Sequence, residues 1–226
     1  MNLGIYIHGL ILRLVFILFG LGLSDLGFCQ MALAPKQLLV IKPGVDRIHG
    51  TWVAAVMNRG QKPEVFSVPV MLPKESRDFQ PVEGVAPADI KLETDGVYVN
   101  KAFPPGVNVL SFAFISDAKY GRAELNIQAK SDVGELSVMT PRGMLSISGR
   151  DFVDAGSDVQ DLQMYSILTS RTPVAKGDEL RLSISEVPEG RMRLWFFGGI
   201  FALVLCCAAG YLTWRTRHIE KVTLDF

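Results

Sequence analysis

The sequence predicts an all-β fold with a membrane-directed segment at each end. Apolar and polar residues alternate with a period of two, most clearly in segments 124–130 and 179–185, as they do in half-buried strands. Turn residues such as Lys176-Gly177-Asp178 separate these runs. Between the two ends we expect no long amphipathic helix. The spacing of short strands therefore favours one large or two small β-sandwiches.

The expected strands follow one another closely along the chain. They are 38–41, 51–57, 65–72, 90–92, 97–99, 109–116, 124–130, 135–140, 144–148, 162–168 and 179–185. Segments 51–57, 65–72 and 109–116 are apolar almost throughout, which is typical of strands buried on both faces or placed at a sheet centre. Asp95-Gly96 predicts a hairpin turn between 90–92 and 97–99. If there are two sandwiches, we expect them to divide near 117–120.

Composition excludes two broad classes of protein. The chain has 226 residues, with 23 Lys+Arg and 23 Asp+Glu, so its formal net charge is zero. A nucleic-acid-binding domain would normally carry a basic excess, so nucleic acid is not an expected partner. A hydrophobic fraction of 49% with 20% charged residues excludes a mostly disordered chain.

The N-terminal segment 1–29 has the pattern of a signal peptide. Arg13 precedes an apolar core at 14–23, which is short for a membrane span and suitable for the hydrophobic region of a signal peptide. The small-x-small pattern Gly27-Phe28-Cys29 predicts cleavage before Gln30. Two alternatives remain: an uncleaved anchor over 5–23, and lipidation at Cys29.

Segment 194–214 is predicted to be a transmembrane helix. It contains no charged residue, and at about 1.5 Å per residue it would span a hydrocarbon core of about 30 Å. Aromatic and basic residues suited to the membrane interface flank it. These are Arg191, Arg193, Trp195, Tyr211, Trp214, Arg215 and Arg217. The predicted signal peptide would export the segment that precedes this helix. The β region 30–193 would then face the periplasm, and the tail 215–226 would lie in the cytoplasm.

Small residues recur at every fourth position of this predicted helix. Gly198, Ala202, Cys206 and Gly210 would form one shallow face, and such stripes allow close helix–helix approach in membranes. The alternative is an inert anchor, because glycine and alanine are common in membrane spans. Cys206 and Cys207 are both expected to act as small packing residues of this helix.

The order of strands and turns in the middle region carries a resemblance. One strand ends at Asn58-Arg59-Gly60 and another at Leu72-Pro73, and Pro105-Gly106 precedes an aromatic-rich strand. Near the end, Lys176-Gly177-Asp178 is followed by a last alternating strand and Val187-Pro188. The pattern resembles bacterial membrane-anchored extracytoplasmic β-sandwich proteins of the carboxypeptidase-regulatory-like or fibronectin-III-like kind. The resemblance implies an immunoglobulin-like or transthyretin-like sandwich without catalytic function.

Residues suited to catalysis or metal binding are few. His49 is the one histidine expected in the exported region, and we interpret it as a surface or half-buried residue at a strand end. No catalytic residue and no cofactor is predicted. Acidic residues gather at Asp151, Asp154, Asp158 and Asp161 around Gly156. Carboxylates in a glycine-containing loop could hold calcium, but the spacing is not that of an EF-hand, and a solvated polar loop is the main interpretation.

These inferences predict a non-catalytic binding or scaffold protein of the bacterial inner membrane. It would be a single-pass accessory subunit of an envelope complex, and not an enzyme. Its expected partners are the lipid bilayer and another membrane or periplasmic protein. One alternative is an assembly factor for an envelope process such as cytochrome maturation or secretion. A second is a calcium-dependent ligand-binding module that uses the aspartate cluster.

Overall fold

The protein is mostly β-sheet, as its alternating sequence predicts. A computed structural model describes residues 30–160, 162–190, 198–209 and 211, and these residues contain fourteen strands. All the strands precede Pro188, where the first of two compact units ends. Segment 1–29, which holds the predicted signal peptide and its alternatives, lies outside the described residues.

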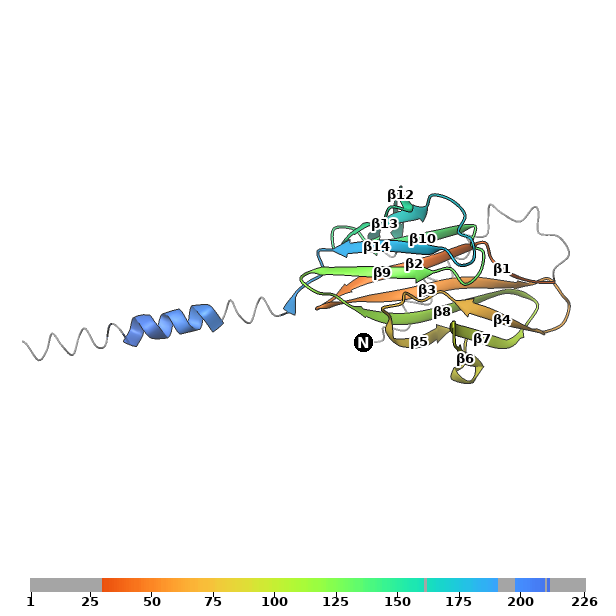
Figure 1. The fold of residues 1–226 in the computed structure, drawn as a ribbon, viewed down its shortest axis with the longest axis horizontal. Helices are drawn as coiled ribbons and strands as arrows, with labels where there is room; N and C mark the ends of the chain where they lie inside the picture. The colour runs from red at the N-terminus through yellow and green to blue at the C-terminus, as the bar shows by residue number, and fades with distance from the viewer. Residues whose placement is uncertain (1–29, 161, 191–197, 210, 212–226) are drawn as a thin grey trace, which may run out of the picture. The chain divides into compact units, whose positions relative to one another are not determined.

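The strands form one large sheet and two small ones (Figure 1). The order of the large sheet is β12 (Phe152–Gln160), β13 (Gln163–Ser170), β10 (Glu135–Pro141), β2 (Lys36–Gly44), β3 (Arg47–Asn58), β8 (Gly106–Asp117) and β5 (Arg77–Glu83), with β1 (Met31–Leu33) also paired to β3. One small sheet is β11 (Ser146–Ser148), β14 (Glu179–Ser185) and β9 (Arg122–Gln128). The other is β4 (Glu64–Val70), β7 (Gly96–Phe103) and β6 (Ile90–Glu93), preceded by the short 3₁₀ helix η1 (Pro87–Asp89).

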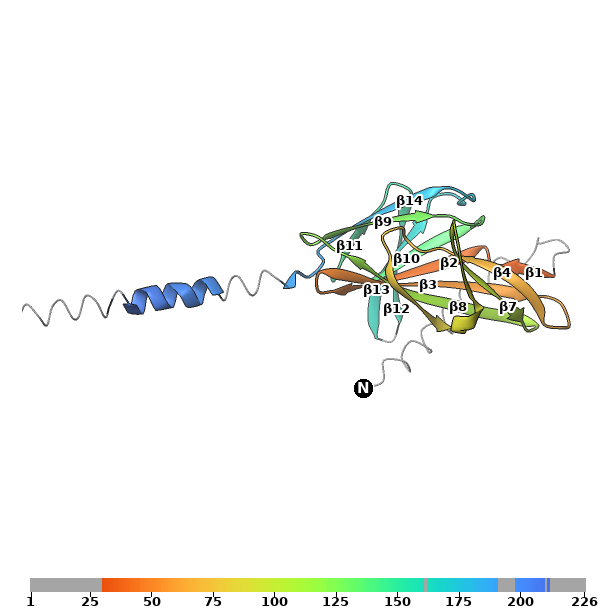
Figure 2. The ribbon, with the colours of Figure 1, turned by 60° about the horizontal axis from the view of Figure 1, so that its bottom comes forward.

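One hydrophobic core joins the three sheets. Alternate residues of β3 and β8, among them Trp52 and Phe112, belong to the same buried cluster as Leu182 of β14 and Val99 of β7. Both small sheets therefore pack on the same side of the large sheet, and Figure 2 shows β9 and β14 lying across it. The cluster includes residues from before and after 117–120, so in the described residues the two predicted halves share a core.

The central strands of the large sheet are buried on both faces, as the continuous apolar runs at 51–57 and 109–116 predict. β3 pairs with β2 on one side and with β8 on the other. Its residues Trp52 to Val56 are all buried. A second, smaller cluster with Leu38, Val40 and Val53 occupies the face opposite the main core. Residues on both faces of these strands are thus removed from water, which explains why apolar and polar residues do not alternate in these runs.

The prediction for segment 65–72 is wrong in one respect. It becomes β4, which pairs with β7 alone and is therefore an edge strand of a small sheet. Val68 and Val70 are buried, but Val65 is 67% exposed. The apolar residues of this run do not all face a core, because its outer face has no second sheet over it.

Three strands were not expected. β1 and β5 each pair along one side, with β3 and β8 respectively, and β5 contains two register shifts. β12 covers most of the predicted polar loop 151–161 and pairs with β13 throughout its length. Short or irregular edge strands such as these have weak sequence patterns because few of their side chains face a core.

The second unit begins at Glu189 and includes helical residues 198–209. No helix within the described ranges is both long and apolar enough to cross a membrane. The predicted span 194–214 extends beyond them, because 194–197, 210 and 212–214 lie outside the described residues.

Candidate functional site

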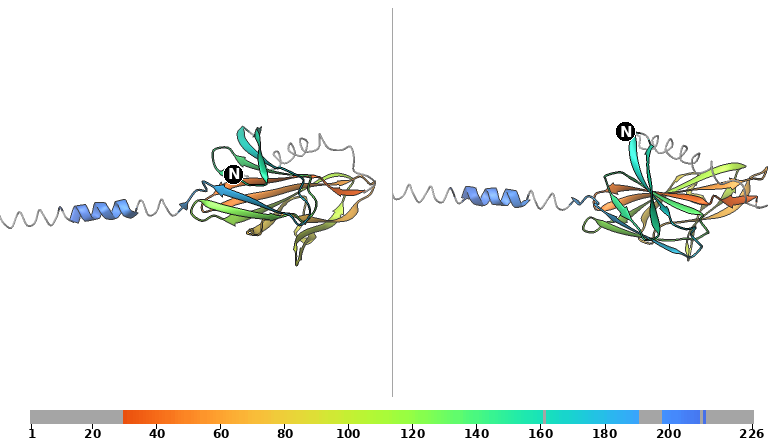
Figure 3. Two further views of the ribbon diagram at one scale, coloured as in Figure 1. Left: turned by 45° about the horizontal axis from the view of Figure 1, so that its top comes forward. Right: turned by 90° about the horizontal axis from the view of Figure 1, so that it is seen from above.

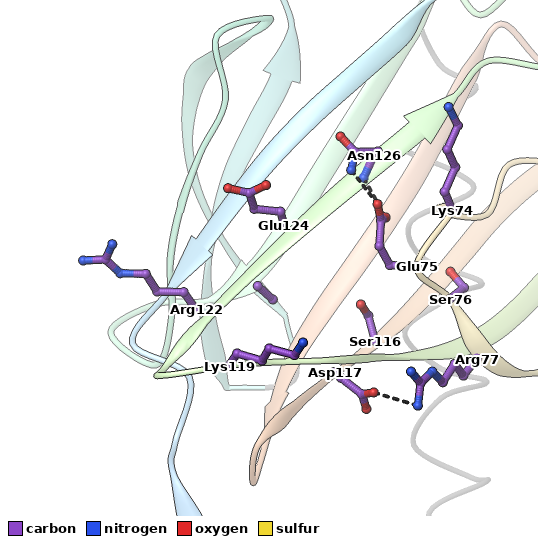
Figure 4. A pocket seen from close by; sticks show the side chains of 11 residues that line it. Lys74, Glu75, Ser76, Arg77, Ser116, Asp117, Lys119, Arg122, Glu124 and Asn126 are labelled. Atoms are coloured by element: carbon purple, nitrogen blue, oxygen red, sulfur yellow. Dashed lines mark hydrogen bonds and ion pairs between the residues drawn. The ribbon is translucent and has the colours of Figure 1, made fainter.

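A polar hollow of about 530 Å³ lies on the β domain where three segments meet. They are the connection after β4, the end of β8 and the strand β9 (Figure 4). The connection is held in place by an isolated bridge between Pro73 and Ile127. The Lys74 amide also donates a hydrogen bond of 2.9 Å to the Asn126 carbonyl. A rigid backbone therefore positions the side chains that line the hollow.

Glu75 is the carboxylate most firmly held in this site. It accepts a hydrogen bond of 3.0 Å from the Asn126 amide, and a second from the Asn126 side chain. Partial burial raises the pKa of Glu75, but the hydrogen bonds from Asn126 and the nearby Lys74 outweigh that effect, so the pKa lies below its ordinary value of 4.5. Glu75 is therefore anionic at neutral pH and ties the connection to β9.

Two further ion pairs hold charged residues at the rim. Lys74 binds Glu179 of β14, and this contact lowers the pKa of Glu179. Arg77 binds Asp117 with an Nη1–Oδ2 distance of 2.9 Å. Both side chains of the second pair are more than half exposed, at 72% and 51%, so the pair contributes little to stability. These contacts link the connection after β4 to β14 and to the end of β8.

Two cations beside the hollow have no ion pair within 4 Å in the part of the chain that the structure describes. Lys119 and Arg122 flank the β8–β9 turn and exchange backbone hydrogen bonds of 2.8 and 3.0 Å. In Figure 4, Lys119 extends toward Ser116 and Asp117, whereas Arg122 extends away from the hollow. The hollow is open and carries both signs of charge, so at most it would bind a small anion weakly and in a salt-dependent way.

Two members of the aspartate cluster, Asp154 and Asp158, lie on strand β12 rather than in a loop, which corrects that part of the sequence analysis. Asp154 pairs with Leu168, and Asp158 pairs with Tyr165. A bulge between Asp154 and Gly156 shifts the register by one residue, so the two carboxylates lie on opposite faces of the hairpin. Within the described residues no group of three or more potential ligands could hold a metal ion.

The carboxylates of this cluster also have local partners. Asp154 accepts a hydrogen bond of 2.7 Å from the Gly156 amide, and Asp158 accepts one of 2.8 Å from the Val159 amide. Asp151 lies 3.7 Å from Arg150 in an ion pair. Asp161 lies outside the described residues. These contacts shape an edge strand, and charges with a bulge are typical of edges that resist pairing with another chain.

The remaining predicted residues fall on the second unit or near strand ends. Gly198, Ala202 and Cys206 are helical and exposed, as is Tyr211, whereas Gly210 lies outside the described residues. So do the interface residues Arg191, Arg193, Trp195, Trp214, Arg215 and Arg217. His49 is exposed on β3, in agreement with the sequence analysis.

None of the residues lining the hollow was expected from the sequence. Its two halves, 74–77 and 116–126, are far apart along the chain, and each contains mixed charges that are ordinary for loops. The charged turn after Leu72-Pro73 and the one around Tyr120-Gly121 are visible in the sequence. Their proximity depends on the pairing of β5 with β8 and on the Pro73–Ile127 bridge, which no local pattern encodes.

Comparison with known proteins gives no family for this chain. No protein-family model matches it, and no curated protein matches it. Among solved structures it is similar to an M1 zinc metallopeptidase from Deinococcus radiodurans, with 14% identity and a TM-score of 0.39, over 72% of this chain and 44% of that one. A two-domain M1 zinc metallopeptidase bound to L-tryptophan gives 14% identity and a TM-score of 0.37. The chain thus spans less than half the length of these structures.

Proposed function

We propose that this protein is a non-catalytic binding or scaffold protein, held at a bacterial inner membrane with its β domain in the periplasm. One observation carries the proposal: the β domain ends at Pro188, and the uncharged segment 194–214 begins six residues later. The domain is thus tethered on a very short connection to a segment suited to a membrane. In this proposal the protein belongs with the membrane-anchored extracytoplasmic β-sandwich proteins that its strand and turn order resembles.

The contacts within the hollow support a binding role over catalysis. Four of its charged side chains are held by neighbours: Lys74 by Glu179, Arg77 and Asp117 by each other, and Glu75 by Asn126. A catalytic site usually contains a polar group without a hydrogen-bond partner, or a group with a strongly shifted pKa, that is aimed at the substrate. Here the charges hold neighbouring segments together, which suits a surface that presents a fixed shape.

The projecting hairpin β12–β13 supports a protein partner. It extends away from the body of the sandwich, as the teal strands in Figure 3 show. Apolar side chains are exposed around its tip, including Val159 at 60%, Met164 at 42% and Leu162, which is fully exposed. Exposed apolar groups gathered on one element favour association with another protein. We propose that this hairpin contacts a membrane or periplasmic partner of the same envelope complex.

Membrane fractionation tests the proposed anchoring. We expect the full chain to remain in the membrane pellet after alkaline carbonate extraction, because a spanning helix resists it. A variant that ends after Pro188 should move to the soluble fraction. Extraction of the full chain would contradict the proposal. A truncated chain that stayed in the pellet would show that the N-terminal segment, and not 194–214, holds the protein.

A further inference from the structure

The β domain ends between two turns: that of the β2–β3 hairpin, and the one between β8 and β9, which belong to different sheets. The Asp46 amide, at the β2–β3 turn, donates a hydrogen bond of 2.8 Å to the Pro188 carbonyl. The Val187 amide donates one of 3.0 Å to the Gly121 carbonyl at the β8–β9 turn. A third bond, from the Ala118 amide to the Asp46 carbonyl, joins the two turns directly. Figure 1 shows both turns at the end of the domain where the chain leaves β14.

The short connection after Pro188 keeps these two turns close to the proposed membrane. Residues 189–193 separate Pro188 from the apolar segment, so six Cα–Cα steps join Pro188 to Leu194 and reach at most about 21 Å when fully extended. The headgroup layer on each side of a bilayer takes up about 6 Å of that distance. If 194–214 spans the membrane, Pro188 therefore lies within about 15 Å of the outer edge of the headgroups.

Tyr120 is an unusual residue for its position. It is 92% exposed and has a φ of 52° in the β8–β9 turn, a conformation that favours glycine, asparagine or aspartate. Neither core packing nor turn geometry explains a tyrosine there. Tyrosine is enriched at membrane interfaces, where the ring meets the acyl boundary and the hydroxyl meets water. Val45 at the neighbouring turn is also exposed, at 57%.

Charged side chains at the same end can meet lipid phosphates. Arg47 and Arg122 are exposed, and neither forms an ion pair within 4 Å with any carboxylate in the described ranges. Asp46 and Glu186 lie here as well and are exposed, so this end is mixed in charge rather than strongly basic. Contact with a membrane should therefore depend first on Tyr120 and Val45, and second on the two arginines.

We propose that the β2–β3 and β8–β9 turns rest on the membrane in which the protein is anchored. Tyr120 enters the headgroup interface beside Val45, and Arg47 and Arg122 bind lipid phosphates. The inference rests on the proposed function, since the short connection matters only if 194–214 spans the bilayer. The contact would fix the orientation of the β domain and direct its far end, with the β3–β4 and β7–β8 connections, away from the membrane.

Depth-dependent quenching in lipid nanodiscs tests this contact on the full chain. The three native cysteines, Cys29, Cys206 and Cys207, are replaced by alanine, and Lys119→Cys, an exposed position in the same turn as Tyr120, is labelled with a fluorophore. The matched control is Val107→Cys, which is also exposed and lies near the opposite end of β8, in register with Met57. The discs contain phosphatidylethanolamine, phosphatidylglycerol and a headgroup nitroxide lipid.

We expect the label at 119 to be quenched several-fold more than the label at 107. Arg47→Glu with Arg122→Glu should reduce quenching at 119, whereas Lys62→Glu, at the far end, should not. Equal quenching at 119 and 107 in a chain that co-elutes with the discs would overturn the contact and leave the anchoring intact. A full chain that fails to enter the discs would overturn the anchoring and, with it, the contact.

Discussion

Truncation of Trp52 should cause the largest loss of stability among single substitutions in the core of the β domain. Its side chain is 1% exposed and packs on Phe112 with ring centroids 6.2 Å apart. Replacing a buried tryptophan by alanine typically costs about 3–5 kcal/mol of unfolding free energy. We expect Trp52→Ala to reach that range in urea denaturation of the full chain in detergent, followed by circular dichroism. Val107→Ala, at an exposed position, should stay within about 0.5 kcal/mol of the parent.

A buried hydrogen bond allows the packing and polar contributions to be separated. Trp52 Nε1 donates to Gln37 Oε1 at 2.8 Å, and Gln37 is fully buried. Trp52→Phe keeps much of the ring but leaves the buried Gln37 Oε1 without its hydrogen-bond donor, which should cost about 1–3 kcal/mol. Combining it with Gln37→Leu removes both polar partners, so the double variant should be more stable than Trp52→Phe alone. Strictly additive losses would show that the two side chains do not interact.

Gly50→Ala should have the second largest effect. Gly50 lies opposite Phe114 in the β3–β8 ladder, and a Cβ at this position would come within 2.1 Å of the Phe114 ring. Phe114 is itself buried in the main core, so it has little room to move. Overpacking of this kind typically costs about 1–3 kcal/mol. Urea denaturation in detergent measures the loss.

A second-site change provides the control for Gly50. Phe114→Leu opens space at the same point, so Gly50→Ala with Phe114→Leu should recover part of the stability lost in Gly50→Ala. Gly143→Ala introduces the same side chain at a positive φ of 76° with no atom within 4 Å, so it reports backbone strain without a clash. A loss in Gly50→Ala no larger than that in Gly143→Ala would contradict the packing explanation.

Strand positions could be predicted where one face of a strand meets a core. The alternation at 179–185 gives β14, with Leu180, Leu182 and Ile184 buried, and Asp95-Gly96 gives the β6–β7 hairpin. β12 could not be predicted, because most of its side chains are exposed and its bulge breaks the period of two. Alternation reports burial, so a strand with no buried face looks like a loop in the sequence.

The candidate site and the domain exit depend on tertiary contacts that sequence patterns do not encode. Glu75 and Asn126 meet because the Pro73–Ile127 bridge joins the connection after β4 to β9. Pro188 meets Asp46 because β14 ends beside the β2–β3 turn. The exposure of Tyr120 in the β8–β9 turn also depends on the fold. Its significance emerges only once the turn is placed beside the end of the domain.

Thiol labelling in spheroplasts tests the central claim, that the β domain is exported and anchored by segment 194–214. In the cysteine-free background, Val107→Cys reports on the β domain and Val222→Cys on the tail. We expect a membrane-impermeant maleimide to label Val107→Cys in intact spheroplasts and Val222→Cys only after lysis. Labelling of Val222→Cys before lysis, or protection of Val107→Cys until lysis, would contradict the account.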